Sequence, residues 1–281
     1  MRILVTNDDG IDTPGIIHLA RAMAELAEVV VIAPNREFSG ASAAIGALYR
    51  GAPTVERREF EGGLEAWAVD GPPALGVFYA TNGVFGAPFD LVVSGINPGA
   101  NTGRSVYYSG TIGACTAGRN AGWSGVAVSQ HVDFGSIEGQ AFDDVIATQK
   151  WHSAAEVATA FVSGLLADLP AEPVIANLNV PNLEVADMVG WRLAPIARHR
   201  FGTGDSGSLV PIADRPGHYD VKLGWTRQPE PPLGTDAGSV TNAIIAVSYL
   251  SPVEHQSLRD DLAKPESSLS NLVSQLFADP Y

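Results

Sequence analysis

Two adjacent acidic side chains, Asp8 and Asp9, follow a short apolar run at residues 3–6, with Asn7 between the run and the pair. Such a run is typical of a buried strand, and open α/β sheets place their ligand crevice at the carboxyl ends of parallel strands. Neighbouring carboxylates repel each other, and a divalent cation between them relieves the repulsion because hard cations take oxygen ligands. The alternative is a polar turn, since Asn, Asp and Gly are ordinary turn residues. The pair alone favours the turn, so the metal hypothesis depends on the rest of the chain.

Polar segments also follow two other expected strands. Residues 34–42 come after an apolar run at 29–33, and residues 95–103 come after one at 91–94. The strand ends of a parallel sheet meet at one edge, so polar side chains from distant parts of the sequence can converge there. The side chains expected to converge are Asp8, Asp9, Ser39, Asn97 and Ser109.

The oxygen-rich character of this set indicates which chemistry it could perform. Carboxylate, hydroxyl and amide oxygens suit Mg²⁺, Mn²⁺ or Ca²⁺ and do not suit a tetrahedral zinc site of Cys and His. Ser109, Gly110 and Thr111 open an expected helix and offer N–H groups and hydroxyls to an anion, although alone they are more simply a helix cap. A metal beside an anion site predicts phosphoester chemistry.

The elements that must position these side chains predict an α/β fold. A strand at 3–6, a helix beginning after Thr13 and a strand at 29–33 form a βαβ unit with parallel pairing. We expect a Rossmann-like catalytic domain over residues 1–181, with a mostly parallel sheet and helices on both faces. Further strands are expected within 54–70 and at 91–94, 126–129 and 174–180, the last as the final strand of the main sheet, with helices at 72–80, 111–121 and 153–169.

Residues 182–281 have a different character and are expected to form a C-terminal extension. The segment 202–217 reads as an excursion or hairpin, 243–250 as a strand and 258–277 as a helix. A strand outside the main sheet could pair with another subunit, which predicts that the extension is exchanged in an oligomer.

Composition excludes several classes of protein. The chain has 281 residues, of which 46% are hydrophobic, so a substantial core can form, and its net charge of −14 disfavours binding to a nucleic-acid polymer. Cys115 is the single cysteine, which excludes a disulfide framework. There is neither a signal-peptide pattern nor an apolar stretch of about 18 residues, so a cytoplasmic protein without a membrane partner is the default expectation.

In this order and spacing, the motifs resemble the SurE family of survival-protein nucleotidases and acid phosphatases. The resemblance spans about residues 1–250. It rests on ILVTNDDG at 3–10, SGAS at 39–42, SGIN at 94–97, YSGTIG at 108–113 and GTD at 234–236.

The resemblance implies a metal-dependent phosphomonoesterase acting on nucleoside 5′- or 3′-monophosphates, in some members also on short polyphosphate. It further implies a homodimer or homotetramer whose C-terminal parts are exchanged between subunits. The implied ligands of one Mg²⁺ or Mn²⁺ ion are Asp8, Asp9, Ser39 and Asn97. The implied phosphate-binding residues are Asn101, Ser109, Gly110 and Thr111. Either Asp8 or Asp9 would take a proton from the attacking water, and the sequence does not choose between them.

Several positions depart from the family pattern while the implied metal ligands are intact. Phe38 stands where a glutamine is usual, Ala43 where a histidine or serine is common, Arg104 where an acidic residue is frequent and Ala117 where a glutamate is usual. Such changes affect substrate preference more than reaction type. Two alternatives stay open: a catalytically decayed nucleotide-binding or regulatory protein, and a purely structural assembly.

Overall fold

The structure, a computed structural model, describes residues 1–46, 51, 53–132, 146–198, 204–225 and 230–251. The strands are β1 (Arg2–Thr6), β2 (Glu28–Pro34), β3 (Val55–Arg58), β4 (Glu65–Val69), β5 (Leu91–Pro98), β6 (Ser124–Gln130), β7 (Ile175–Val180), β8 (Gly190–Leu193), β9 (Gly204–Pro211), β10 (Tyr219–Trp225) and β11 (Ile244–Leu250). The helices are α1 (Pro14–Ala24), α2 (Pro73–Thr81), α3 (Gly110–Asn120), α5 (Trp151–Ala167) and α6 (Asp236–Val240), and the 3₁₀ turns are η1 (Glu61–Gly63), η2 (Gly103–Tyr107) and η4 (Val185–Asp187).

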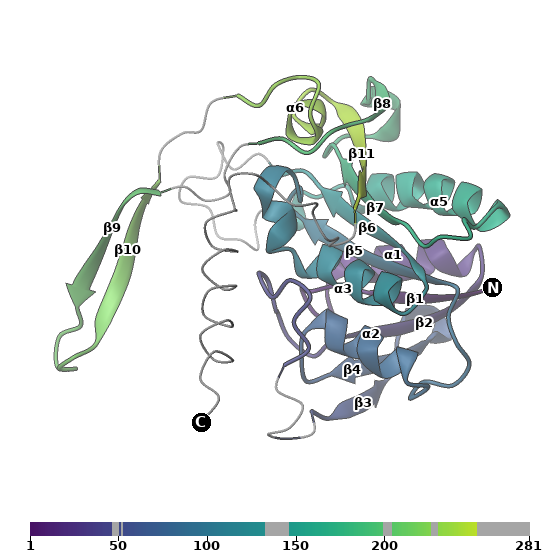
Figure 1. The fold of residues 1–281 in the computed structure, drawn as a ribbon, viewed down its shortest axis with the longest axis horizontal. Helices are drawn as coiled ribbons and strands as arrows, with labels where there is room; N and C mark the ends of the chain where they lie inside the picture. Colours follow the sequence, from purple (N-terminus) through teal and green to yellow (C-terminus); the bar gives the residue numbers. More distant parts are fainter. Residues whose placement is uncertain (47–50, 52, 133–145, 199–203, 226–229, 252–281) are drawn as a thin grey trace, which may run out of the picture. The chain divides into compact units, whose positions relative to one another are not determined.

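One sheet holds nine of the described strands, in the order β3-β4-β2-β1-β5-β6-β7-β11-β8 (Figure 1). The strands from β4 to β7 run parallel, as the apolar runs predicted. The chain passes from β1 to β2 on one side and returns to β5 on the other side of β1. The topological switch point, where open sheets bind ligands, therefore lies between the carboxyl ends of β1 and β5.

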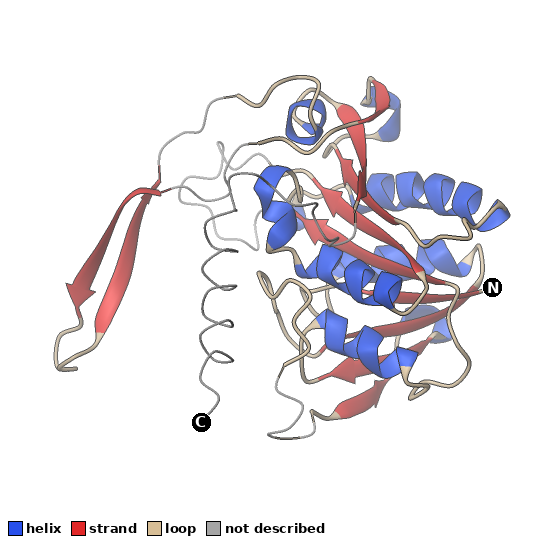
Figure 2. Ribbon diagram, viewed as in Figure 1, coloured by secondary structure: helices blue, strands red, loops and turns tan. Residues whose placement is uncertain are grey.

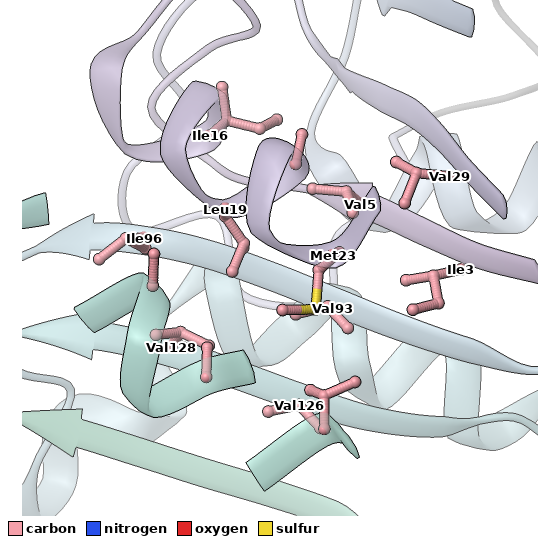
Figure 3. Close-up of a cluster of buried hydrophobic side chains, with 14 of the residues drawn as sticks. Ile3, Val5, Ile16, Leu19, Met23, Val29, Val93, Ile96, Val126 and Val128 are labelled. Carbon is pink, nitrogen blue, oxygen red and sulfur yellow. The ribbon is translucent and has the colours of Figure 1, made fainter. Parts of the chain in front are cut away.

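Helices cover both faces of this sheet, which confirms the predicted α/β architecture (Figure 2). α1 and α5 pack on one face, and α2 and α3 pack on the other. Ile16, Leu19 and Met23 recur along one side of α1 and are fully buried against the strands (Figure 3). This helical spacing gives α1 its apolar face and fixes the turn before it at the switch point.

The prediction that residues 174–180 form the final strand of the sheet is wrong. β11 pairs antiparallel with β7, and β8 pairs parallel with β11, so two C-terminal strands extend the sheet within the same chain. Their pairing satisfies the N–H and C=O groups that a β7 edge would otherwise expose. Hydrophobic pattern specifies a strand and its buried face but does not name its partner, which is why the sequence missed this pairing.

The predicted excursion is a hairpin, β9–β10, which forms a separate two-stranded antiparallel sheet. The described residues up to Leu250 belong to one compact unit. The helix expected at 258–277 lies outside the described residues, and the division at residue 181 with exchange between subunits stays a prediction. No helix in the part of the chain that the structure describes is long and apolar enough to cross a membrane.

Candidate metal and phosphate site

The turn after β1 is held by the side chain of Asn7, which is fully buried. Its Nδ2 donates to Gly10 O (3.0 Å) and to Thr13 Oγ1 (2.9 Å), and its Oδ1 accepts from Gly10 N (3.2 Å). Gly10 has a φ of +117°, which favours glycine. This local network fixes the backbone from which Asp8 and Asp9 extend.

Asp8 is buried against the amino terminus of α3. Its Oδ1 accepts from Thr111 Oγ1 (2.7 Å), and its Oδ2 accepts from Gly110 N (3.1 Å). Burial raises the pKa of the Asp8 carboxyl, and the bonds from Thr111 and Gly110 oppose that rise. The anion at this helix start is therefore the Asp8 carboxylate, placed where free N–H groups and the helix dipole favour negative charge.

Gly110 allows this close approach. A Cβ atom at position 110 would lie 2.7 Å from both Cβ and Oδ2 of Asp8, which is closer than van der Waals contact permits. The first residue of α3 must therefore lack a side chain for Asp8 to occupy its present place.

Asp9 is only partly exposed, and its Oδ2 atom is buried without a hydrogen-bond partner. Burial raises the pKa of Asp9 well above its usual range, and repulsion from Asp8 and then Glu37 adds to the rise. No Lys, Arg or His side chain among the described residues forms an ion pair with Asp8 or Asp9. Such an orphaned oxygen beside a second carboxylate fits a cation ligand.

The loop after β2 reaches Asp8 through its backbone, since Phe38 N donates to Asp8 O at 2.7 Å. The Arg36 guanidinium lies 4.8 Å from the centre of the Phe38 ring. Ser39 is exposed, and its Oγ donates to Glu37 Oε1 (2.8 Å). The loop is thus in the expected place, with the Ser39 hydroxyl bonded to a neighbouring carboxylate.

Asn97 comes from β5, where the pairing with β6 shifts register between Ser94 and Asn97. Its Nδ2 donates to Gly99 O (2.7 Å), and its Oδ1 lies 3.3 Å from Thr111 Oγ1. The Thr111 hydroxyl therefore lies between the Asn97 amide and the Asp8 carboxylate. The structure brings these three side chains together across the switch point. The strand-end argument predicted that Asp8 and Asn97 would converge, but it did not include Thr111.

Asn101 and Ser109 both make hydrogen bonds within the protein, Asn101 to a distant strand and Ser109 to the start of its own helix. Asn101 Nδ2 donates to Ser129 Oγ (2.9 Å), and Ser109 Oγ accepts from Ile112 N (3.1 Å), so Ser109 is the N-cap of α3. Both residues are buried, and the segment between them leads directly into the α3 start. Their role toward phosphate stays a prediction.

Sequence reasoning missed Glu37, a third carboxylate near the pair. Glu37 and Asp9 both line a cavity of about 60 Å³, with Ile96 and Trp151 among the apolar residues of its wall. An acidic residue two positions before Ser39 was the available signal. No three His, Cys, Asp or Glu side chains in the described ranges are grouped so that they could hold a metal ion, so a metal would need the mixed oxygen set that includes hydroxyl and amide groups.

A known protein family matches the part of the chain that contains these site residues. Residues 3–203 match the family model described as survival protein SurE. The chain belongs to the SurE family. It is 38% identical over 201 residues to the 5′-nucleotidase SurE of Alkalilimnicola ehrlichii, a match that covers 71% of each chain. It is 41% identical over 187 residues to the 5′-nucleotidase SurE of an Acinetobacter baumannii strain, covering 65% of this chain and 66% of that relative.

Solved structures agree with this membership in the SurE family. The crystal structure of the SurE protein from Aquifex aeolicus matches with a TM-score of 0.67 and 26% sequence identity. The match covers 96% of this chain and 100% of that one.

Proposed function

We propose that this SurE-family chain is a metal-dependent phosphomonoesterase that hydrolyses nucleoside 5′-monophosphates, and also 3′-monophosphates, to nucleoside and phosphate. The observation that carries the proposal is the buried, unpartnered Oδ2 of Asp9 beside the Asp8 carboxylate at the switch point. The names of the relatives, 5′-nucleotidases at 38–41% identity, support the substrate class.

The residues present fit one hard divalent cation, Mg²⁺ or Mn²⁺. Its ligands would be Asp8, Asp9, Ser39 and Asn97, which together offer carboxylate, hydroxyl and amide oxygens. When bound, such an ion polarises a phosphoryl oxygen and lowers the pKa of water. Binding Ser39 in this way requires its hydroxyl to leave Glu37, to which it is bonded in the structure.

The two aspartates have different roles in this proposal. Both oxygens of Asp8 already accept hydrogen bonds from the α3 start, which favours the ionised form of that carboxylate against the effect of burial and fixes its position. Asp9, whose Oδ2 has no such donor, is the side chain that would accept a proton from the attacking water. In this proposal Asn101, Ser109, Gly110 and Thr111 hold the phosphate group, which requires the Gly110 N–H and the Thr111 hydroxyl to be shared between the phosphate and the Asp8 carboxylate that they bond in the structure.

A phosphate-release screen tests the proposal. Nucleoside 5′- and 3′-monophosphates, short polyphosphate and sugar phosphates are each incubated with Mn²⁺, with Mg²⁺ and with a chelator. We expect release from nucleotides that requires the metal. Tight nucleotide binding without release from any substrate would instead indicate a decayed binding protein, and no binding of metal or nucleotide would indicate a structural assembly.

We further propose that the chain forms a homodimer or homotetramer through the β9–β10 hairpin. Leu209 lies opposite Val221 across the two strands, and both side chains are 66% exposed. Tyr219 and Leu223 lie two positions before and two positions after Val221, so they share its face of the strand, and both are also exposed. An isolated two-stranded hairpin is marginally stable, so an apolar face of this kind favours burial against another surface.

A further inference from the structure

A second buried carboxylate, Asp236 at the start of α6, lies outside the set that the motifs predicted. It is fully buried, and three backbone N–H groups donate to it. Its Oδ2 accepts from Gly103 N (2.8 Å), and its Oδ1 accepts from Ala197 N (2.8 Å) and Ala237 N (2.7 Å). Among the described residues, no cationic side chain pairs with it.

Local helix capping does not account for this carboxylate. Thr235 is the N-cap of α6, and its Oγ1 accepts from Gly238 N at 3.2 Å. Two of the three donors to Asp236 come from distant segments, Gly103 being 133 residues away and Ala197 being 39. A buried carboxylate is unfavourable unless it is fully hydrogen-bonded, so a charged residue here needs a reason beyond the helix itself.

The segment that Asp236 holds is the one that leads into the α3 start. Before Gly103, the carbonyl of Asn101 accepts from Asn177 Nδ2 (2.8 Å) and Asn179 Nδ2 (3.2 Å) of β7. After Gly103, Ser109 N donates to Ser105 O (3.1 Å), which connects η2 to the helix cap. Gly103, with a φ of +56°, is the point between these anchors where the Asp236 carboxylate attaches.

The other contacts of Asp236 join the two ends of the excursion that carries the hairpin. Asp236 N donates to Pro195 O (3.0 Å), and Ala197 N donates to the carboxylate before the chain leaves toward β9. On the return side, Thr235 N donates to Pro232 O (3.0 Å), directly before Asp236. Asp236 therefore stands at the return end of the excursion, and its side chain binds Ala197 at the outgoing end and Gly103 in the segment 101–109.

We propose that Asp236 is a positioning residue, which fixes the segment 101–109 against the base of the C-terminal excursion and so sets the place of the α3 start. The catalytic consequence rests on the proposed function, in which that segment holds phosphate. The structural consequence does not rest on it, because it concerns only the order of the segment.

The test is Asp236→Asn in the full chain. The amide oxygen can keep the two bonds from Ala197 and Ala237, and its NH₂ group then faces the N–H of Gly103, where a donor meets a donor. We expect amide hydrogen exchange in peptides covering 101–109 to become at least 10-fold faster. We also expect KM for the nucleotide to rise at least 10-fold, because small displacements of positioning groups are costly.

The matched control is Thr235→Ala, which removes the neighbouring cap of the same helix and leaves the Gly103 contact in place. It should leave exchange at 101–109 unchanged. Unchanged exchange in Asp236→Asn, or an equal increase in both variants, would overturn the proposal. If the wild-type protein released no phosphate, the proposed phosphatase function would be wrong. The comparison of hydrogen exchange would still decide whether Asp236 is a positioning residue.

If Asp236→Asn does not fold, the wild-type protein supplies the test. The amide of Gly103 should then exchange as slowly as the amides of the α3 interior, because its acceptor is a fully buried carboxylate. Rapid exchange at Gly103 would contradict the proposal.

Discussion

Asp8 and Asp9 are neighbours in sequence but have different surroundings. Asp8 accepts hydrogen bonds at both oxygens, whereas Asp9 keeps a buried oxygen with no partner. Burial raises the pKa of both carboxyls, and repulsion from Asp8 and then Glu37 adds to the rise at Asp9. The pair is therefore a source of instability that a bound cation would relieve.

Asp9→Asn is expected to abolish activity and to stabilise the metal-free protein. Turnover should fall at least 1000-fold, while the Tm in chelator at pH 7 should rise by roughly 2–4 °C, equivalent to about 1 kcal/mol for a chain of this size. In the wild type, the raised pKa of Asp9 contributes to the free energy of unfolding while the Asp9 carboxyl is neutral. This contribution is fully present below the ordinary carboxyl pKa near 4, and it is lost as the pH rises through the raised pKa of Asp9. Thermal unfolding in chelator between pH 4 and 8 measures this, and a lower Tm for the variant at pH 7 would contradict it.

Gly110→Ala should displace Asp8, because the added methyl group would lie 2.7 Å from its carboxylate. We expect at least a 100-fold loss of turnover and a loss of about 1–3 kcal/mol in the free energy of unfolding. The matched control is Gly164→Ala in α5, where no atom lies within 4 Å and the change should stabilise the helix by about 0.5–1 kcal/mol. Kinetics and denaturant unfolding of both variants measure the difference. Wild-type turnover in Gly110→Ala would show that the approach of α3 to Asp8 is not required.

At the scale of elements, the site depends on α3 packing closely against the loop after β2. A Cβ atom at Gly113 would lie 2.0 Å from Ser42 O, and Ser42 N in turn donates to Tyr108 O at 3.1 Å. A glycine in the second turn of α3 thus allows the loop that carries Ser39 to lie against the helix. The position of Ser39 is set by this contact together with the bond from Phe38 to Asp8.

Gly113→Ala is therefore expected to move the 39–43 loop and weaken metal binding. Mn²⁺ affinity measured by calorimetry should fall about 10-fold, and the free energy of unfolding should fall by about 1–3 kcal/mol from overpacking. Thr116→Ala, one turn further along α3, leaves the Ser42 contact intact and serves as the control. Equal Mn²⁺ affinity in Gly113→Ala and wild type would contradict this role of the loop.

The sequence predicted most of the elements and the convergence of Asp8 and Asn97, because apolar runs and strand-end geometry are local signals. It did not predict that Thr111 and Gly110 bind Asp8, since that contact joins residues more than 100 positions apart. It also did not predict that Glu37 would lie near Asp9. The GTD motif at 234–236 was part of the family resemblance, but no role was predicted for Asp236. Long-range pairing of β11 and β8 was missed for the same reason: periodicity does not identify partners.

At the scale of the whole molecule, the β9–β10 hairpin carries four of the large, exposed hydrophobic side chains that the structure describes. Its one face carries Leu209, Tyr219, Val221 and Leu223, while Ser206 and Ser208 lie on the other. The four large apolar side chains on one face support a role in assembly between copies of the chain.

The double variant Leu209→Lys with Val221→Lys should break such an assembly. Light scattering of the wild type should report a multiple of the 29.4 kDa chain mass, and the variant should report the mass of one chain. Ser206→Lys with Ser208→Lys adds the same charge to the polar face and should leave the assembly intact. A wild-type mass of one chain at micromolar concentration would contradict assembly through the hairpin.

The most direct test of the shared-cation site is a crystal structure of the protein soaked in Mn²⁺, with the anomalous signal recorded. We predict one anomalous peak per chain at the switch point, in contact with oxygens of both Asp8 and Asp9, and no such peak in Asp9→Asn. If the wild-type map shows no peak there and the two carboxylates point apart into solvent, the site does not bind a cation and the proposed chemistry is wrong.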